Sequence, residues 1–312
     1  MKMHRKINLA DLLPVIAALL LNGCSLNRFA VNVIGDAMSD GGGVYSTDND
    51  PQLIREALPF GLKVFESLLE VSPDHQGLLL SASRGFAAYA FIVQSENEQR
   101  DKTDVNQSRE QGDRIRNLFL RGRDFALRGL DVRHRGLADQ LRKDPSAALA
   151  VTTKDDAPFL YWGGASWGGA ISAAKGDLNL LADLPLAGAL VQRVLELDER
   201  HDLGAAHEFF ISFEASRPGG TTARVRQHYR RALDLSGGQR ASVHLALAEA
   251  VAVKEQNLGE FRDLISAAMA VPIDKRPELR LVNTIARQRA LWLEKRIEDL
   301  FVDAPPLKEN AQ

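Results

Sequence analysis

The sequence predicts an all-α protein made of antiparallel helix pairs joined by short turns. From Pro51 onward, apolar residues recur at the three- and four-residue spacing of one helix face. No segment shows the strict two-residue alternation of a half-buried strand. Clusters of Pro, Gly, Ser and Asp separate the periodic segments, so each helix can turn back on the one before it.

Length, composition and charge limit what this chain can be. Its 312 residues are enough for one large domain or two ordinary ones. A hydrophobic content of 45% and a charged content of 26% are normal for a water-soluble globular protein. The formal net charge of -2 gives no overall basic field, so we expect no nucleic-acid partner.

The N-terminus has the pattern of an export signal. Lys2, Arg5 and Lys6 precede a ten-residue apolar run at 12–21, which is too short to span a bilayer. The run ends in Leu-Asn-Gly-Cys, which resembles a bacterial lipobox, and Cys24 is the single cysteine of the chain. The sequence predicts a lipoprotein signal peptide at 1–23 and lipidation of Cys24. The alternative is a plain secretory signal with a chance cysteine.

Lipidation of Cys24 indicates where the protein works. Acyl chains there anchor the chain to a membrane while the remainder stays soluble. Ser25 stands where an aspartate would favour retention at the inner membrane. We expect a periplasmic protein at the inner leaflet of the outer membrane. Its parts are a lipidated tether and lead-in at 24–50, a single helical-repeat domain at 51–302 and a flexible tail at 303–312.

The first helices are indicated by caps and apolar faces. After a short helix at 29–37, Asp50 and Pro51 form an N-cap followed by proline at the first helical position. That helix runs to a Ser-Pro-Asp break. A second helix at 78–93 is apolar on nearly every face, so we expect it to be central. The polar stretch 95–110 is expected to cross the surface.

A long amphipathic helix follows, with an apolar face from Ile115 to Leu130. The arginines elsewhere on this helix are expected to form a solvated face paired with acids; the alternative is a phosphate or carboxylate site. Shorter helices around 137–141 and 146–151 lead to the stretch 159–169. In the second half, periodic segments predict helices at 186–197, 203–215, 222–235, 239–255, 258–270 and 278–301.

The segment 68–73 resembles the A-L-x-L-x-P sequence that closes a tetratricopeptide unit, and 194–198 and 232–236 are related versions that lack the proline. The last two start 38 residues apart (194 to 232), near the 34-residue period of that repeat. Small and branched residues at the end of one helix let the next helix turn back over it. The sequence therefore predicts stacked antiparallel helix pairs in a degenerate tetratricopeptide-repeat-like superhelix with a concave face.

The most unusual stretch is 159–169, FLYWGGASWGG, which holds Tyr161 and two of the three tryptophans, Trp162 and Trp167. It contains a literal G-x-S-x-G around Ser166. A serine-nucleophile elbow needs a buried strand before the serine, but residues 154–158 read as a turn and a helix start. A serine esterase is therefore the weakest of the functions considered.

The histidines give no catalytic or metal-binding pattern. His201 and His207 are six positions apart and do not share a helix face, and the chain has no H-E-x-x-H sequence or cysteine pair. Each histidine is expected to be a surface or capping residue. The sequence predicts a protein that is not an enzyme and has no metal or cofactor.

Two interpretations of the aromatic stretch stay open. As a helix, it places Gly164 and Gly168 one turn apart, where a neighbouring helix can approach closely. Glycine weakens a helix by up to about 1 kcal/mol, so the glycines there need a structural reason. The other interpretation is a ligand groove with a glycine floor and walls of Tyr161, Trp162 and Trp167.

Six segments of the chain resemble one known family, the T component associated with TRAP (tripartite ATP-independent periplasmic) transporters, often called TatT. They are ALPFGLK (57–63), SPDHQGLLL (72–80), LRGRDF (120–125), LYW (160–162), ALDLSGG (232–238) and LVNTIA (281–286). The resemblance covers roughly residues 53–301. It implies a periplasmic lipoprotein of tetratricopeptide-like helices that partners the solute-binding subunit of a transporter. It also implies a ring-like homo-oligomer, such as a trimer, with a ligand cleft or pore.

The resulting hypothesis is a non-enzymatic lipoprotein that docks a TRAP-type solute-binding protein and hands over a small, partly apolar solute such as an organic acid. The candidate cleft residues are Tyr161, Trp162, Trp167 and Asn283, the last from the matching segment 281–286. The alternative is a tetratricopeptide-like scaffold lipoprotein for cell-envelope assembly. A serine esterase built on Ser166 is the third hypothesis.

Overall fold

The computed structural model describes residues 31–38, 43–99, 105–174 and 176–303, and this part of the chain is helical and contains no strand. The prediction of an all-α fold is therefore confirmed. The predicted signal peptide, Cys24 and almost all of the predicted tail lie outside the described residues. Residues 31–38 are helical, which overlaps the short helix expected at 29–37.

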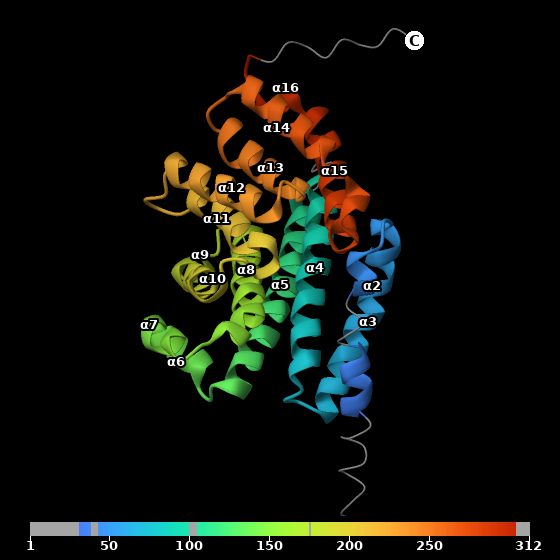
Figure 1. Ribbon diagram of the computed structural model, residues 1–312, viewed down its shortest axis with the longest axis vertical. Helices are drawn as coiled ribbons and strands as arrows, with labels where there is room; N and C mark the ends of the chain where they lie inside the picture. The colour runs from blue at the N-terminus through green and yellow to red at the C-terminus, as the bar shows by residue number, and fades with distance from the viewer. Residues whose placement is uncertain (1–30, 39–42, 100–104, 175, 304–312) are drawn as a thin grey trace, which may run out of the picture.

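The first half contains the longest helices of the described chain (Figure 1). They are α2 (Gly43–Ser46), α3 (Pro51–Val71), α4 (Gln76–Gln99), α5 (Val105–Arg133), α6 (Leu137–Lys143), α7 (Pro145–Ala150), α8 (Ala157–Ala173), α9 (Leu178–Ala182) and α10 (Leu184–Asp198). The cap predicted for α3 is present, because the Asp50 carboxylate accepts hydrogen bonds from the backbone N–H groups of Gln52 and Leu53.

The second half continues with shorter helices. A tight turn, η2 (His201–Gly204), leads into α11 (Ala205–Ser216), α12 (Thr222–Ser236), α13 (Ala241–Leu247), α14 (Leu258–Ala270), α15 (Arg280–Glu294) and α16 (Ile297–Leu300). A π-helical turn at Ala248–Ala252 extends α13. The predicted helix 278–301 is wrong in one respect, because the chain breaks after α15 and restarts as α16.

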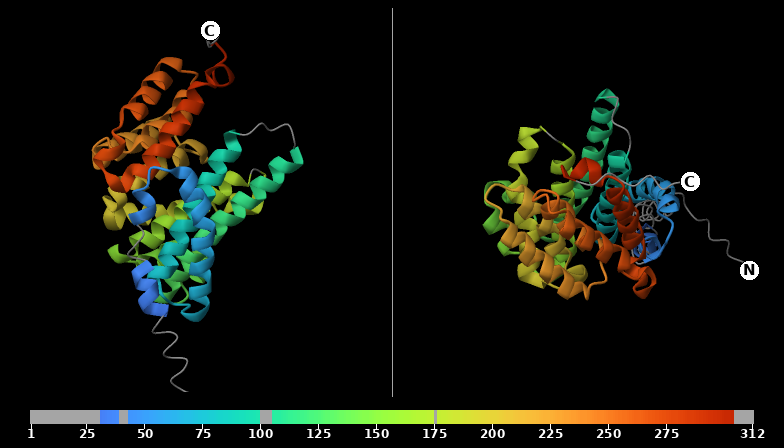
Figure 2. Two further views of the ribbon diagram at one scale, coloured as in Figure 1. Left: turned by 90° about the vertical axis from the view of Figure 1, so that its right-hand side faces the viewer. Right: turned by 90° about the horizontal axis from the view of Figure 1, so that it is seen from above.

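The polar stretch 95–110 differs from its prediction as a surface crossing. Helix α4 extends to Gln99 and α5 begins at Val105, so most of the stretch is helical. The stretch contains no proline or glycine, and its Glu, Gln and Arg residues are good helix formers. Figure 2 (left) shows the C-terminal end of α4 and the N-terminal end of α5 projecting from the body.

Several helices adjacent in the chain pack side by side, such as α3 with α4, α4 with α5 and α11 with α12. Helix α8 packs extensively against α5 and α10, which are not its immediate neighbours in the chain. The buried apolar side chains form two clusters that meet at α11, where Phe210 belongs to the first and Ile211 to the second. Helix α8 lies within the first cluster, between α5 and α10. The aromatic stretch is therefore carried by a central helix.

The glycines of α8 allow this close packing. A Cβ atom on Gly164 would lie 2.8 Å from the carbonyl oxygen of Ala187 and 2.5 Å from the Val191 Cγ2 atom on α10. On the opposite side, a Cβ atom on Gly169 would lie 2.6 Å from the ring of Phe119 on α5. The packing interpretation therefore explains these two glycines.

One described stretch, Leu178–Asp198, is long and apolar enough by composition to cross a membrane. In the structure it consists of α9 and α10, which meet at Asp183. Helix α10 buries Leu190, Val191 and Val194 in the first apolar cluster. Core packing therefore accounts for the apolar side chains on one face of α10, while Leu178 and Leu181 of α9 are exposed.

Candidate functional site

The two aromatic positions at the start of α8 lie at the surface of the core. Tyr161 and Trp162 are half-buried, and their rings meet edge to face with centroids 5.2 Å apart. The guanidinium carbon of Arg84, on α4, lies 5.9 Å from the centroid of the Trp162 ring. The ring of His201, in η2, lies 5.8 Å from that of Tyr161. Side chains from three elements thus meet here.

Trp167 occupies a different position from the cleft wall that was predicted. It is 0% exposed and lies in the first apolar cluster. The guanidinium carbons of Arg123 and Arg142 lie 4.8 and 5.3 Å from the centroid of its ring. The interpretation of Trp167 is corrected to core packing, because its side chain leaves no surface for a ligand.

The predicted role of Asn283 is also corrected: it is a structural cap and does not line a cleft. It is 1% exposed, and its Oδ1 atom accepts a hydrogen bond from the backbone N–H of Ala241 at 3.0 Å. Its Nδ2 atom donates to the carbonyl oxygen of Gln239 at 3.0 Å. The side chain therefore caps the start of α13 from α15, and both of its polar atoms are occupied.

Ser166 has no catalytic neighbour in the described part of the chain. Its side chain is 0% exposed, and its Oγ atom has no hydrogen-bond partner there. A Cβ atom on Gly122 of α5 would lie 2.9 Å from this oxygen, so the serine sits where α5 and α8 approach closely. A nucleophilic serine needs a base within hydrogen-bond reach. The position instead suits a small residue between helices.

Tyr161 and His201 are held in their neutral forms. Burial raises the pKa of the Tyr161 hydroxyl, and the carboxylates of Glu208 and Asp202 raise it further while Arg240 opposes them. Burial also lowers the pKa of His201, and the nearby positive charges add to this effect while Asp202 and Asp198 oppose it. At neutral pH, the phenol and the imidazole therefore present uncharged polar edges.

The segment after His201 has a strained backbone. Asp202, Leu203 and Gly204 all have positive φ, at 43°, 57° and 83°. Such values are costly for a leucine, which has a branched side chain. The side chain of Arg240, only 7% exposed, fixes the segment by donating from Nη2 to the Asp202 carbonyl oxygen at 2.9 Å and to its Oδ1 atom at 3.0 Å.

Sequence reasoning missed Arg84, His201 and Arg240 as neighbours of the aromatic pair. Arg84 lies on a helix that reads only as a central apolar segment, and Arg240 comes from a loop between helices. No short motif joins these residues to Tyr161. Helix packing alone brings them to one surface.

A second polar cluster joins α10, α11 and α12. The Nδ1 atoms of His207 and His228 lie 2.8 Å apart, and His207 Nε2 lies 3.1 Å from Glu199 Oε1. With neutral rings, His207 donates to Glu199 and His228 donates to His207. The ring of His228 stacks on Phe210, with centroids 5.0 Å apart. Burial, together with electrostatic repulsion from His207 and against the opposing effect of Glu214, lowers the pKa of His228 to about 4.

This cluster predicts a loss of stability in acid. In the unfolded chain, His228 titrates near its ordinary pKa of 6.5, whereas in the folded protein its pKa is about 4. Between these values the unfolded state binds more protons, so stability falls as the pH decreases from about 6.5 to 4. Because the ring is partly exposed and solvent screens its charge, we expect His228 to contribute a loss of roughly 1–2 kcal/mol. Urea unfolding at pH 7, 6, 5 and 4 measures it.

The variant His228→Asn tests the origin of that loss. Asparagine retains an amide that can donate to His207 but does not titrate. We expect the decrease in unfolding free energy between pH 7 and pH 4 to be smaller than in the unaltered protein. An equal decrease in both proteins would assign the acid sensitivity to other groups.

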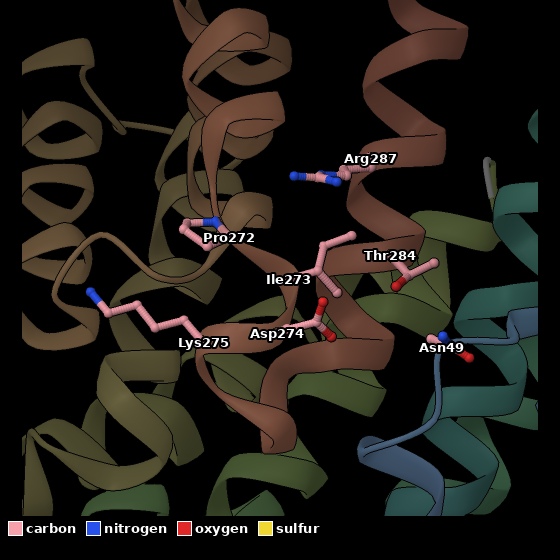
Figure 3. Close-up of a pocket in the computed structure, with 7 residues that line it drawn as sticks. All are labelled: Asn49, Pro272, Ile273, Asp274, Lys275, Thr284 and Arg287. Carbon is pink, nitrogen blue, oxygen red and sulfur yellow. The ribbon is translucent and has the colours of Figure 1, made fainter.

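A surface hollow of about 460 Å³ lies elsewhere, between α15 and the segment before it (Figure 3). Its lining residues are Asn49, Pro272, Ile273, Asp274, Lys275, Thr284 and Arg287. The Nη2 atom of Arg287 donates to the carbonyl oxygens of Met269 and Val271, so this guanidinium is partly occupied by the protein. The hollow contains none of the predicted cleft residues.

Within the described ranges, no group of three or more His, Cys, Asp or Glu side chains is arranged to hold a metal ion. The carboxylate bonded to the His207–His228 pair, Glu199, also pairs with Arg231. Helix packing brings Arg84, Tyr161, Trp162 and His201 together at another place on the structure.

Comparison with known proteins gives two matches over most of the chain. A family model described as TRAP transporter T-component (TAtT) matches residues 47–301. An uncharacterized protein of Treponema pallidum (strain Nichols) is 24% identical over 309 residues, covering 92% of this chain and 96% of that protein. The region matched by the family model includes every helix from α3 to α16.

Proposed function

Because the chain belongs to the TRAP transporter T-component family, we propose that it docks the solute-binding subunit of a TRAP-type transporter and passes a small, partly apolar solute. The observation that carries this proposal is the family match over residues 47–301. A transporter-associated family also favours a role in binding over a role in catalysis.

The proposed architecture is a degenerate tetratricopeptide-like superhelix. The antiparallel packing of helices adjacent in the chain supports it, since that is how such repeats stack. A repeat array of this kind offers an extended concave surface for a partner protein. A ring-like homo-oligomer such as a trimer, which the family resemblance implies, is part of the same proposal.

The proposed solute surface is the one around Tyr161 and Trp162. These aromatic side chains are half-buried and accessible from outside, whereas Trp167 and Asn283 are enclosed. Ligand sites are lined mostly by apolar and aromatic groups with a few placed polar ones. The surface formed with Arg84 and His201 has that composition.

The proposed location is the periplasmic face of the outer membrane, with the chain anchored by acyl chains on Cys24. The lipobox-like sequence before Cys24 supports this part of the proposal. The same anchor holds the helical domain close to the membrane, because parts of 24–50 lie against that domain. Ser72 donates to the Asn32 Oδ1 atom at 2.6 Å, and Arg280 donates to the Thr47 carbonyl oxygen at 3.0 Å.

Affinity purification of the tagged full chain from native membranes tests the proposal. We expect a TRAP-type solute-binding protein to co-purify with it, as identified by mass spectrometry. The Cys24→Ser variant, which cannot be lipidated, is expected to move to the soluble fraction. Recovery of barrel-assembly proteins in place of a solute-binding protein would favour the envelope-scaffold alternative, and retention of Cys24→Ser in the membrane would contradict the anchor.

A further inference from the structure

A second surface hollow, of about 230 Å³, lies where α4 begins and α5 ends. Its lining residues are Asp74, Arg128, Asp131, Val132 and Arg135. Asp74 belongs to the turn before α4, and Arg135 to the turn after α5, while the other three residues stand in the last turns of α5. Two positive side chains, two negative side chains and one apolar side chain therefore surround the hollow.

Arg128 differs from three other arginines of α5. Arg116, Arg121 and Arg123 pair with carboxylates at 2.9, 3.1 and 2.7 Å, as the sequence predicted for a solvated face. Arg128 makes no ion pair or hydrogen bond within the described ranges of the chain. A guanidinium without a carboxylate keeps all of its N–H donors for a ligand.

The other charged groups of the hollow are also largely unoccupied. Neither Asp74 nor Arg135 has an ion pair or hydrogen bond to another residue that the structure describes. Asp131 is three positions from Arg128 on α5, a spacing at which opposite charges often pair, yet these two do not pair. The Oδ1 atom of Asp131 instead accepts from the Ala138 backbone N–H at 2.8 Å. The hollow can thus serve a ligand that carries both charges.

The hollow lies beside the first described residues of the chain. Ser72 donates to Asn32 Oδ1 at 2.6 Å, and His75 Nε2 lies 3.2 Å from the Asn32 carbonyl oxygen. The helix at 31–38 therefore packs against the turn that holds Asp74. Figure 1 shows this helix at the same end of the molecule as the start of α4 and the end of α5.

This end of the molecule is also the end nearest to the proposed lipid anchor. Cys24 precedes Val31 by seven positions (24 to 31), and seven residues span at most about 25 Å. Two large apolar side chains on the helix at 31–38, Val33 and Ile34, are 53% and 50% exposed. Apolar side chains are stabilised where they enter the boundary of a bilayer. A lipid surface is therefore the ligand source closest to the hollow.

We propose that this hollow binds the headgroup of an ethanolamine phospholipid, which joins a phosphodiester to a primary ammonium group. Arg128 and Arg135 supply N–H donors for the phosphate oxygens, and Asp74 accepts hydrogen bonds from the ammonium. Val132 contacts the methylene groups between the two charges. Headgroup binding orients the helical domain on the membrane. The inference goes beyond the proposed function, of which it uses only the anchor at Cys24.

Co-sedimentation with lipid vesicles tests the site. The mature chain, residues 24–312, carries Cys24→Ser so that acyl chains do not contribute to binding. The vesicles contain phosphatidylcholine alone, or phosphatidylcholine with an equal amount of phosphatidylethanolamine or phosphatidylglycerol. We expect roughly tenfold stronger binding to the vesicles with phosphatidylethanolamine. Choline has no N–H donor for Asp74, and the glycerol headgroup has no cation.

Two variants separate the two halves of the headgroup. Arg128→Gln should weaken binding to phosphatidylethanolamine and phosphatidylcholine vesicles alike, since both lipids carry the phosphate. Asp74→Asn should reduce binding to phosphatidylethanolamine vesicles to the phosphatidylcholine level and leave phosphatidylcholine binding unchanged. Arg262→Gln is the matched control, because Arg262 is an exposed arginine on α14, far along the chain from the hollow. Urea unfolding verifies that each variant is folded.

Soluble competitors distinguish a lipid headgroup from a free anion. Glycerophosphoethanolamine is expected to displace the protein from the vesicles, whereas inorganic phosphate at the same concentration is not. Equal displacement by both compounds would overturn the headgroup assignment. No binding to any vesicle, no preference for phosphatidylethanolamine, or unchanged binding by Arg128→Gln would overturn the site. None of these results decides the docking function, which co-purification of the solute-binding subunit tests separately.

Discussion

Replacing Asp156 by alanine is expected to destabilise the protein by about 3–5 kcal/mol, the usual cost of removing one partner from a buried ion pair. Asp156 is 1% exposed and stands directly before α8. Its Oδ2 atom lies 2.9 Å from His134 Nε2 and accepts from the Thr153 backbone N–H at 2.8 Å, while its Oδ1 atom accepts from Arg133 at 3.2 Å. Removing the carboxylate leaves all three groups without this acceptor.

The electrostatics of Asp156 agree with that role. Burial by itself would raise the pKa of its carboxyl, but the Thr153 hydrogen bond, His134 and Arg133 together lower it below its ordinary value. A lowered folded-state pKa means that the charged form stabilises the fold above the ordinary pKa of a carboxyl, and that this contribution is lost as the pH falls. At neutral pH, therefore, the full contribution is present.

Asp155→Ala is the matched control for Asp156→Ala. Asp155 is the exposed neighbour, and only its backbone carbonyl oxygen takes part in a hydrogen bond, from Arg133 at 2.9 Å. We expect its substitution to change stability by less than about 0.5 kcal/mol. Urea unfolding followed by circular dichroism measures both variants. A loss below about 1 kcal/mol for Asp156→Ala would show that solvent replaces the buried carboxylate.

The sequence allowed most helices to be predicted, because each has its own apolar periodicity and caps. Helix α3 is the clearest case, since Asp50 and Pro51 fix its first turn. The connections were less predictable. The polar residues at the end of α4 were predicted to belong to a segment that crosses the surface, because they have no apolar face. Polar residues that favour a helix nevertheless continue a helix that is already nucleated.

The candidate site was predictable only in part. Tyr161 and Trp162 are half-buried on α8 and stay candidates, but Trp167 is enclosed in the core. Residues five positions apart on a helix point about 140° away from each other, so Trp162 and Trp167 cannot line one wall of a groove. The spacing in the sequence is enough to predict that geometry. The sequence does not predict that Arg84 and His201 lie beside Tyr161 and Trp162, because these two residues come from other elements.

Asn283 shows why the resemblance to a family did not identify a site residue. An asparagine in a matching segment serves equally well as a ligand contact or as a cap, since both uses need its amide. In this structure the partners are the backbone groups of Gln239 and Ala241, more than forty positions away. Only the packing of α15 against α13 reveals which role applies.

Helix α8 connects stability with the proposed function. Its N-terminus is fixed by Asp156, its glycines bring it against α5 and α10, and its outer face carries Tyr161 and Trp162. A displacement of α8 would therefore alter the aromatic surface even where no surface residue changes. Substitutions at the buried glycines test this connection directly.

Replacing Gly164 by valine is expected to destabilise the protein by about 3 kcal/mol or more, since overpacking that requires backbone movement lies at the upper end of its usual range. The added Cβ atom would lie 2.8 Å from the carbonyl oxygen of Ala187, a backbone atom that cannot rotate away. It would also lie 2.5 Å from Val191 Cγ2. Alanine at this position should be less harmful than valine, because alanine adds only the Cβ atom, whereas valine also adds two methyl groups.

Gly112→Ala distinguishes this clash from a general effect of glycine replacement. Gly112 lies in α5, and a Cβ atom there would be 3.7 Å from its nearest neighbour, the carbonyl oxygen of Ala173. Because alanine favours a helix over glycine by up to about 1 kcal/mol, this variant should be as stable as the unaltered protein or more stable. We therefore expect the urea concentration at the unfolding midpoint to be highest for Gly112→Ala. It should decrease from the unaltered protein to Gly164→Ala and be lowest for Gly164→Val. If Gly164→Val unfolds at the same urea concentration as the unaltered protein, α8 and α10 do not pack as closely as the structure shows, and the glycines of the aromatic stretch need another explanation.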